Sequence, residues 1–126
     1  MQLTTIKTNL APAPIGPYSQ AVIANGILYV SGQIPLDPTD GTFKNENIDA
    51  ETTQVMKNLK AILEEAGTTF DKVIKTTIFL TDMALFTQVN EIYGSYFSTH
   101  FPARETVAVK GLPKGANVEI SMIVAI

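Results

Sequence analysis

The chain has 126 residues, 45% of them hydrophobic, and a formal net charge of −3. This length and apolar content predict one domain, residues 1–126, with a core of its own. The absence of cysteine excludes disulfides, a thiolate nucleophile and a cysteine-ligated metal, and the acidic balance disfavours nucleic acid as a partner. No stretch approaches the run of about eighteen apolar residues that a membrane span needs, so we expect a cytosolic protein without a membrane partner.

The first third of the sequence predicts strands. Leu3–Thr8 is a candidate opening strand, and a proline-rich loop follows it. Tyr18–Ala24 and Ile27–Gln33 are two β-prone runs. Between them lies Asn25-Gly26, the dipeptide that most readily supplies the two positive φ angles of a type I′ turn. These two runs are therefore predicted to form a hairpin.

Two helices are predicted from apolar residues that recur at three- and four-residue spacing. The first follows Asp49, whose side chain can cap a helix, and Gly67 ends it. The second follows Asp82 in the same way and ends before Pro102. The apolar positions are Val55, Met56, Leu59, Ile62, Leu63 and Ala66 in the first helix and Leu85, Phe86, Val89, Ile92, Tyr93, Tyr96 and Phe97 in the second. All of these side chains, including the aromatic ones, are predicted to belong to the core.

Three more strands are predicted near Val73–Thr81, Glu105–Val109 and Val118–Ile126. Successive side chains of a strand point to opposite faces, so one face of each strand should be apolar. These faces are Ile74, Ile78 and Leu80 in the first strand, Val107 and Val109 in the second, and Val118, Ile120, Met122, Val124 and Ile126 in the third.

Two amphipathic helices and five or six strands indicate an α+β domain in which both helices pack on one face of a sheet. If Val107 and Val109 face the helices, Arg104 and Glu119 lie together on the helix-free face. That face would also carry Phe79 and other apolar side chains, and it would be too apolar for a monomer in water. Burial against other copies of the chain is the expected consequence.

Arg104 is the single arginine of the chain. A guanidinium presents a rigid fork of donors that matches a carboxylate, and it keeps its charge when partly desolvated. Arg104 is therefore a candidate for binding a carboxylate ligand. The alternative from sequence alone is an ion pair, within or between chains, with one of the twelve acidic residues.

Glu119 is a carboxylate inside an otherwise apolar strand, where its burial is costly unless it is paired or used. Partial burial can raise the pKa of such a group and suit it to general acid or base chemistry through water. Glu119 could equally be the structural partner of Arg104. The single histidine, His100, cannot build a zinc site with several imidazoles.

Five segments of the sequence, in order, resemble the successive signature blocks of the Rid/YjgF family of reactive-intermediate deaminases. They are Ile15–Gln20, Ser31–Pro35, Val89–Tyr93, Pro102–Arg104 and the stretch from Leu112-Pro113-Lys114 through Val118-Glu119-Ile120. Together they span nearly the whole chain, and five blocks in register are far more specific than one motif.

The resemblance implies a chorismate-mutase-like α+β fold with a sheet of about six strands, assembled as a homotrimer with pockets between subunits. It also implies hydrolysis of 2-imino acids to 2-keto acids and ammonia. The imines would derive from 2-aminoacrylate and 2-aminocrotonate, which pyridoxal-phosphate enzymes release. Neither a metal nor an organic cofactor is implied.

The resemblance also implies roles for particular residues. Arg104 would hold the substrate carboxylate and Glu119 would position the attacking water, with Tyr18 as the third member of the catalytic group. The substrate-binding residues would be Ser31, Gly32, Asn90, Arg104 and Thr106, with Gly32 allowing backbone groups to approach the ligand.

One position departs from the family pattern, in which a small residue and then cysteine commonly follow the arginine. This chain has Glu105 and Thr106 there. By strand alternation, Thr106 should share the face of Arg104 and Glu105 should point away. If the backbone turned, Glu105 would compete with the substrate for the guanidinium.

Two further functions compete with the imine deaminase. A non-catalytic regulatory protein could use the same pocket to bind a 2-keto or amino acid. Endoribonuclease activity has also been attributed to relatives, but the acidic charge and the single histidine argue against it. Glu119 favours catalysis, because binding a carboxylate needs only the arginine.

Overall fold

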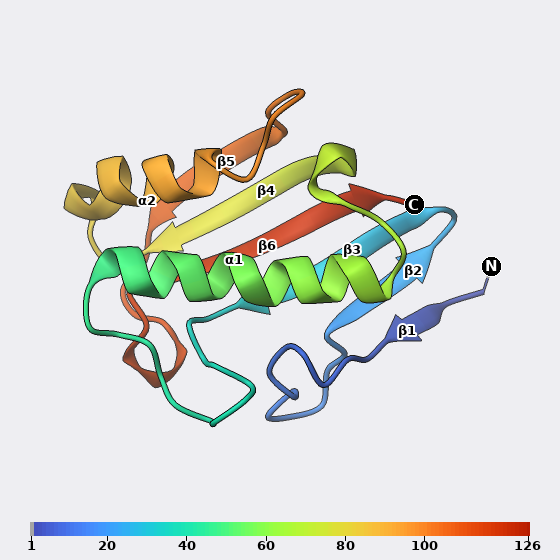
Figure 1. Cartoon of the computed structure of the whole chain (residues 1–126), viewed down its shortest axis with the longest axis horizontal. Coiled ribbons are helices and arrows are strands. Elements are labelled where there is room, and N and C mark those ends of the chain that lie inside the picture. The colour runs from blue at the N-terminus through green and yellow to red at the C-terminus, as the bar shows by residue number, and fades with distance from the viewer. Residues whose placement is uncertain (1) are drawn as a thin grey trace.

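The computed structural model describes residues 2–126 and contains a six-stranded sheet covered by two α-helices (Figure 1). The strands are β1 (Thr4–Ile6), β2 (Ala21–Ala24), β3 (Ile27–Gln33), β4 (Val73–Leu80), β5 (Ala103–Ala108) and β6 (Val118–Ala125). The α-helices are α1 (Ile48–Glu65) and α2 (Phe86–Gly94), and short 3₁₀ turns cover Phe70–Lys72, Met83–Leu85 and Pro113–Gly115.

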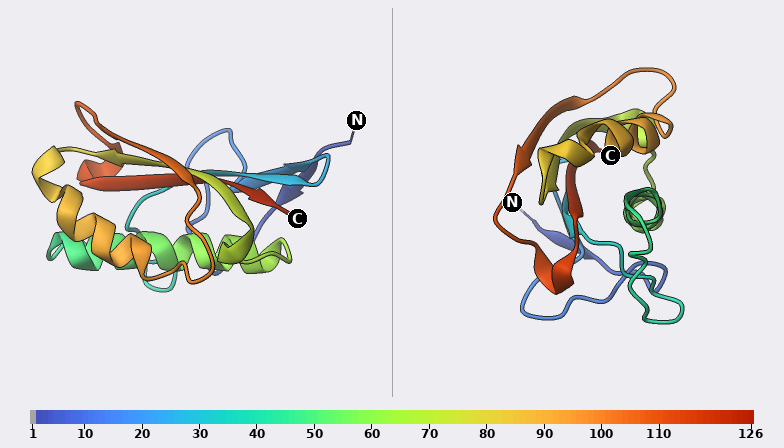
Figure 2. Two further views of the ribbon diagram at one scale, coloured as in Figure 1. Left: turned by 90° about the horizontal axis from the view of Figure 1, so that it is seen from above. Right: turned by 90° about the vertical axis from the view of Figure 1, so that its left-hand side faces the viewer.

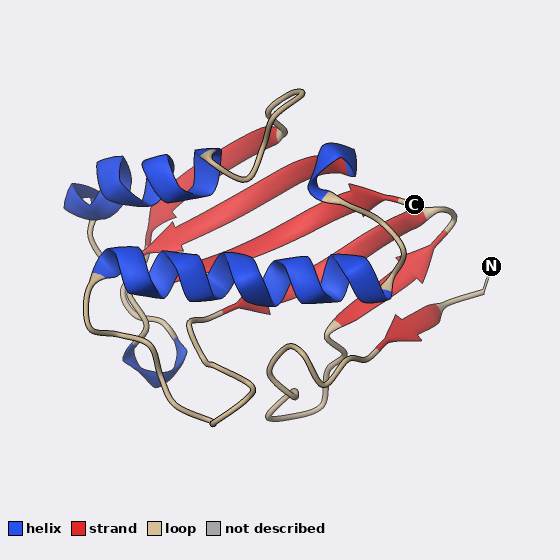
Figure 3. Ribbon diagram, viewed as in Figure 1, coloured by secondary structure: helices blue, strands red, loops and turns tan. Residues whose placement is uncertain are grey.

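The sheet has the strand order β1-β2-β3-β6-β4-β5. All neighbouring strands are antiparallel except β4 and β5, which are parallel and are joined through α2 (Figure 3). Both α-helices lie on one side of the sheet (Figure 2). The predicted α+β class and the placement of the helices on one face are therefore confirmed. Among residues 2–126, no helix is both long and apolar enough to span a membrane.

Local turn chemistry accounts for the hairpin. Asn25 and Gly26 have φ angles of 51° and 77°, so the turn between β2 and β3 uses positive φ at both central residues, as predicted. The paired register then places Ala24 opposite Ile27 and Ala21 opposite Val30.

The helix starts differ from the prediction. The side chain of Asn47, not that of Asp49, accepts the hydrogen bond from the Ala50 amide at 2.8 Å and caps α1. Asp49 lies inside the first turn, where its negative charge interacts favourably with the helix dipole but its side chain does not cap the helix. Asp82 caps the 3₁₀ turn at Met83–Leu85, and α2 begins only at Phe86.

The core lies between the sheet and the two helices. In β6, Val118, Ile120, Met122 and Val124 are all buried, as the alternation predicts. Ile126 lies beyond the strand and is 47% exposed. The prediction for β4 was wrong at one position: a register irregularity between Val73 and Lys75 buries Val73 and leaves Ile74 exposed.

The orientation predicted for β5 was also wrong. Its parallel register pairs Arg104 with Thr76 and Thr106 with Ile78, and both partners are buried on the helix side. Val107 pairs with Phe79 on the opposite face and is 42% exposed. Val107 therefore points away from the helices, and Val109 lies beyond the end of β5. Because β5 is an edge strand with little burial on either face, its valines were no guide to the core.

Candidate active site

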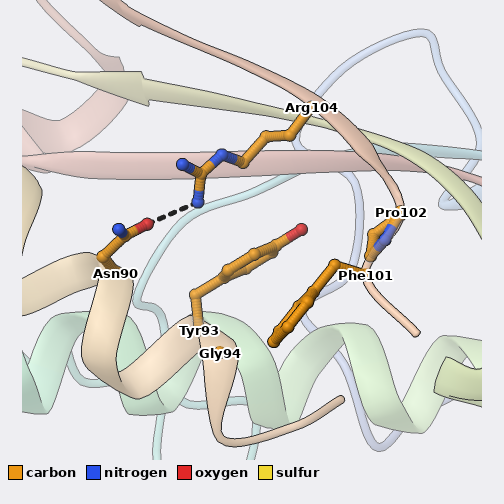
Figure 4. Close-up of a pocket in the computed structure, with 6 residues that line it drawn as sticks. All are labelled: Asn90, Tyr93, Gly94, Phe101, Pro102 and Arg104. Carbon is orange, nitrogen blue, oxygen red and sulfur yellow. Dashed lines mark hydrogen bonds between the residues drawn. The ribbon is translucent and has the colours of Figure 1, made fainter. Parts of the chain in front are cut away.

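Arg104 is held by side chains of α2 (Figure 4). Its guanidinium carbon lies 5.3 Å from the ring centroid of Phe86 and 5.3 Å from that of Tyr93. Nη1 of Arg104 donates a hydrogen bond to Oδ1 of Asn90. Residues 86, 90 and 93 fall on one face of a helix because they are spaced by four and three positions. One helical face thus cradles the guanidinium and restricts its orientation.

The position of the Tyr93 ring is itself fixed by a hydrogen bond to the sheet. Its hydroxyl shares a buried hydrogen bond of 2.8 Å with Oγ1 of Thr76, the residue paired with Arg104 in the neighbouring strand. Burial raises the pKa of Tyr93, although the Thr76 hydrogen bond and the Arg104 charge oppose this shift. The phenol is therefore neutral at physiological pH, and it serves as a rigid platform.

Beside this cradle is an open cavity of about 450 Å³. Its lining residues are Asn90, Tyr93, Gly94, Phe101, Pro102 and Arg104 (Figure 4). Arg104 forms no ion pair with any acidic side chain in residues 2–126. An ion pair within one chain, one of the alternatives for this arginine, is therefore not formed, and donors of the guanidinium remain available to a ligand.

Glu105 does not compete for Arg104. It points away from the arginine, as predicted, because the two residues occupy successive positions of β5. Its carboxylate lies 3.1 Å from Nζ of Lys75 and accepts a hydrogen bond from Thr77 on the helix-free face.

Glu119 lies on the helix-free face of β6, opposite Phe79 of β4. Burial raises the pKa of its carboxyl group, and this shift suits a group that must accept and return a proton. The carboxyl group lies against Gly32: a Cβ at that position would be 2.8 Å from Cδ and 3.0 Å from Cγ of Glu119. A side chain at position 32 would therefore displace the carboxyl group of Glu119 from this position.

Tyr18 and Ser31 lie in the same part of the molecule as Gly32. Tyr18 is 54% exposed and lines a small cavity together with Gly32. Ser31 donates through Oγ to the Ser19 carbonyl at 2.6 Å and through its amide to the Gln20 carbonyl at 3.0 Å. These bonds hold the loop that presents Tyr18 against β3.

The candidate residues therefore form two groups on opposite faces of the sheet. We call Asn90 and Arg104, with Phe86 and Tyr93, the arginine half, and we call Tyr18, Ser31, Gly32 and Glu119 the glutamate half. The expectation that Arg104 and Glu119 share the helix-free face was wrong.

The cradle residues Phe86 and Tyr93 were predicted only as core. Their i, i+7 spacing around Asn90 is the signal that would have grouped them with the arginine. In residues 2–126, no cluster of three or more His, Cys, Asp or Glu side chains is arranged to hold a metal ion.

Thr106 shares the face of Arg104, as predicted, but its hydroxyl oxygen is buried and has no hydrogen-bond partner within residues 2–126. An unpaired buried hydroxyl costs about 1–3 kcal/mol. Thr106→Val keeps the shape and removes the polar group, so the free energy of unfolding should rise by about 1 kcal/mol in a denaturant titration. A lower stability, or a loss of ligand affinity, would instead show that the hydroxyl has a partner in an assembly or in a substrate.

The fold and the site define a small α+β protein with a fixed guanidinium beside an open cavity. Residues 8–126 match the family model described as Endoribonuclease L-PSP, which represents the YjgF/Rid proteins. The chain belongs to this family, and the resemblance found in the sequence is confirmed.

Individual relatives match almost the full chain. A crystal structure of YyfA from Yersinia pestis, described as a Rid-family protein of unknown function, has a TM-score of 0.97, 52% identity, and coverage of 99% of this chain and 100% of that one. Human 2-iminobutanoate/2-iminopropanoate deaminase is 46% identical, over 94% of this chain and 86% of its own length. A Lactococcus lactis protein named as a regulator, AldR, is 52% identical over 94% of both chains.

Proposed function

We propose that the protein is a hydrolytic deaminase that converts small 2-imino acids to 2-keto acids and ammonia. The observation that carries this proposal is a guanidinium fixed by Phe86, Tyr93 and Asn90 beside an open cavity, to which no carboxylate from the described part of the chain is bound. Such a group is prepared for the carboxylate of a substrate. The name of the human relative supports the reaction.

The proposed reaction needs little more from the protein than orientation of the substrate and transfer of one proton by a side chain. Water adds to the electrophilic imine carbon: a C–O bond forms, the C=N π electrons move to nitrogen, and nitrogen takes up a proton. The hydroxyl of this adduct then gives its proton to nitrogen, its O–H electrons form the carbonyl, and the C–N bond breaks, so ammonia leaves and the keto acid remains. In this scheme Glu119 accepts the proton of the attacking water and returns it to nitrogen, while Arg104 holds the carboxylate.

Because the two halves lie on opposite faces of one sheet, a site that uses both must take them from two chains. The helix-free face supports such an assembly, since it presents Tyr29 at 49% exposed and Val107 at 42%, with Phe79 and Ile123 only half-buried. In the proposed homotrimer, each site combines the arginine half of one subunit with the glutamate half of its neighbour.

A mixing experiment tests the reaction and the shared site together. Arg104→Ala and Glu119→Gln are each expected to be inactive. When the two variants are unfolded, mixed in equal amounts and refolded, about one quarter of the sites should contain both intact halves and activity should recover to about that fraction. Imine lifetime in a coupled dehydratase assay is the readout, and sedimentation should give a trimer. No recovery from a mixed trimer would show that both groups act within one chain, whereas an inactive wild-type protein would overturn the deaminase proposal.

A regulatory binding function is the second candidate, and the name of the Lactococcus lactis relative favours it. The arginine half alone would suffice to bind a 2-keto or amino acid. The presence of Glu119 favours catalysis, because binding a carboxylate needs only the arginine half, and burial also raises the pKa of this carboxyl group. Binding of a 2-keto acid by a protein that never shortens the imine lifetime would select the regulatory function.

A further inference from the structure

Glu51, in the first turn of α1, is a buried carboxylate that the proposed reaction does not use. It is 1% exposed and forms no ion pair in residues 2–126. Both of its oxygens instead accept hydrogen bonds from Asn117: Oε1 from the backbone amide at 2.9 Å and Oε2 from Nδ2 at 2.7 Å. Burial of a carboxylate costs free energy of folding. Both oxygens of this carboxylate are bound by a single neutral residue, so its position calls for an explanation.

Asn117 is bound equally well on its other side. Its Oδ1 accepts a hydrogen bond from Oγ1 of Thr81 at 2.9 Å, and its carbonyl accepts one from the Thr81 amide at 3.2 Å. Glu51, Thr81 and Asn117 thus form a clamp that joins the first turn of α1, the end of β4 and the residue that precedes β6.

The clamp lies at the point where the chain enters the strand that carries Glu119. The loop before it forms a 3₁₀ turn at Pro113–Gly115 in which Lys114 and Gly115 have positive φ, 56° and 71°, so regular strand pairing does not hold this segment. Asn117 is two residues from Glu119, whose carboxyl group has little space because it lies against Gly32. A shift at the start of β6 would therefore move the carboxyl group relative to the rest of the glutamate half.

We propose that Glu51 is a positioning residue for Glu119, acting through Asn117. The inference rests on the proposed function only for its effect on turnover. It also predicts an effect on the surroundings of Glu119 that does not depend on activity. Arg104 is not part of the clamp and lies on the face of the sheet opposite Glu119, so keto-acid binding should not depend on the clamp.

Exchange of donors and acceptors across the clamp provides the test. Glu51→Gln places an amide N–H against the N–H group of Asn117, and Asn117→Asp places two carboxylates together. The double variant Glu51→Gln/Asn117→Asp restores a matched pair, with the introduced amide donating to the introduced carboxylate. Each single variant should lower kcat by about 10-fold or more. The double variant should return it to within about 3-fold of wild type. Keto-acid affinity by calorimetry should stay constant throughout, at a temperature at which all variants are folded.

A second readout separates this inference from the deaminase proposal. Titration of the Glu119 carboxyl carbon by NMR should give a raised pKa in the wild type, a value closer to normal in Glu51→Gln, and recovery in the double variant. This result is expected even from a wild type that proves inactive. Should Glu51→Gln fail to fold, Thr81→Val loosens the clamp by one hydroxyl and should produce the same changes to a smaller degree. The inference would be overturned if the folded single variants kept the kcat and the Glu119 pKa of the wild type. It would also be overturned if kcat and keto-acid affinity fell by the same factor.

Discussion

Replacement of Arg104 by lysine should remove most of the imine hydrolysis although the charge is kept. The guanidinium lies against the rings of Phe86 and Tyr93 and donates to Asn90 through Nη1, so its orientation is restricted while other N–H donors stay available beside the cavity that Arg104 lines. An ammonium group can make neither the planar contact with the rings nor two parallel hydrogen bonds to a carboxylate. Losing one such charge-assisted bond costs about 1.5–3 kcal/mol, which corresponds to a fall in kcat/KM of about 10- to 100-fold.

Arg104→Ala should lower kcat/KM further, by about 10³-fold or more, because it also removes the charge. Steady-state kinetics and calorimetric affinity for a 2-keto acid measure both variants. Lys110→Met is the matched control: it deletes a positive charge from the exposed segment directly after β5, away from the cavity lining, and should behave like the wild type. Near-normal kinetics of the lysine variant would mean that charge alone suffices and that the two-point geometry is wrong.

Elements defined by local chemistry could be predicted from the sequence. The Asn25-Gly26 turn dictates its own φ angles, and the strand after it matches the prediction, Ile27–Gln33. The apolar spacing of the first helix predicted the buried set of Val55, Met56, Leu59, Ile62 and Leu63. In these segments the preferences of neighbouring residues and the period of burial agree, so the fold follows from them.

The arrangement of the site depends on a pairing between distant segments. Whether Arg104 faces the helices is decided by the parallel register that sets it beside Thr76, twenty-eight positions earlier in the chain. At an edge strand, alternation separates the two faces without showing which one meets the core. The valines of β5 suggested the wrong side for this reason. The same limit hid the role of Phe86 and Tyr93, because an aromatic residue on an amphipathic helix looks like core until the strand beside it is known.

The separation of the two halves makes Glu119→Gln the variant that distinguishes an enzyme from a binding protein. The substitution preserves the size of the side chain beside Gly32, and the arginine half is on the other face of the sheet. Affinity for a 2-keto acid should therefore remain within about 3-fold of wild type. The amide cannot accept the proton of the attacking water, so the rate of imine hydrolysis should fall by about 10²–10⁴-fold, which is typical of losing a positioned acid or base. Calorimetry and a semicarbazide-trapping assay on the same preparation give the two values.

The exposed residue Glu65, at the end of α1, provides the control. Glu65→Gln makes the same chemical change at a residue that belongs to neither half, so it should alter neither the keto-acid affinity nor the rate of imine hydrolysis. The raised pKa of Glu119 adds an internal check. Because burial holds its proton more tightly, the wild-type rate should fall as pH drops through this raised value, and the glutamine variant should lose that dependence. If affinity and rate fall together, Glu119 supports the shape of the site and does not handle the proton. Full hydrolysis by the glutamine variant would remove Glu119 from the reaction altogether, and the water would then have to be activated by the substrate imine itself.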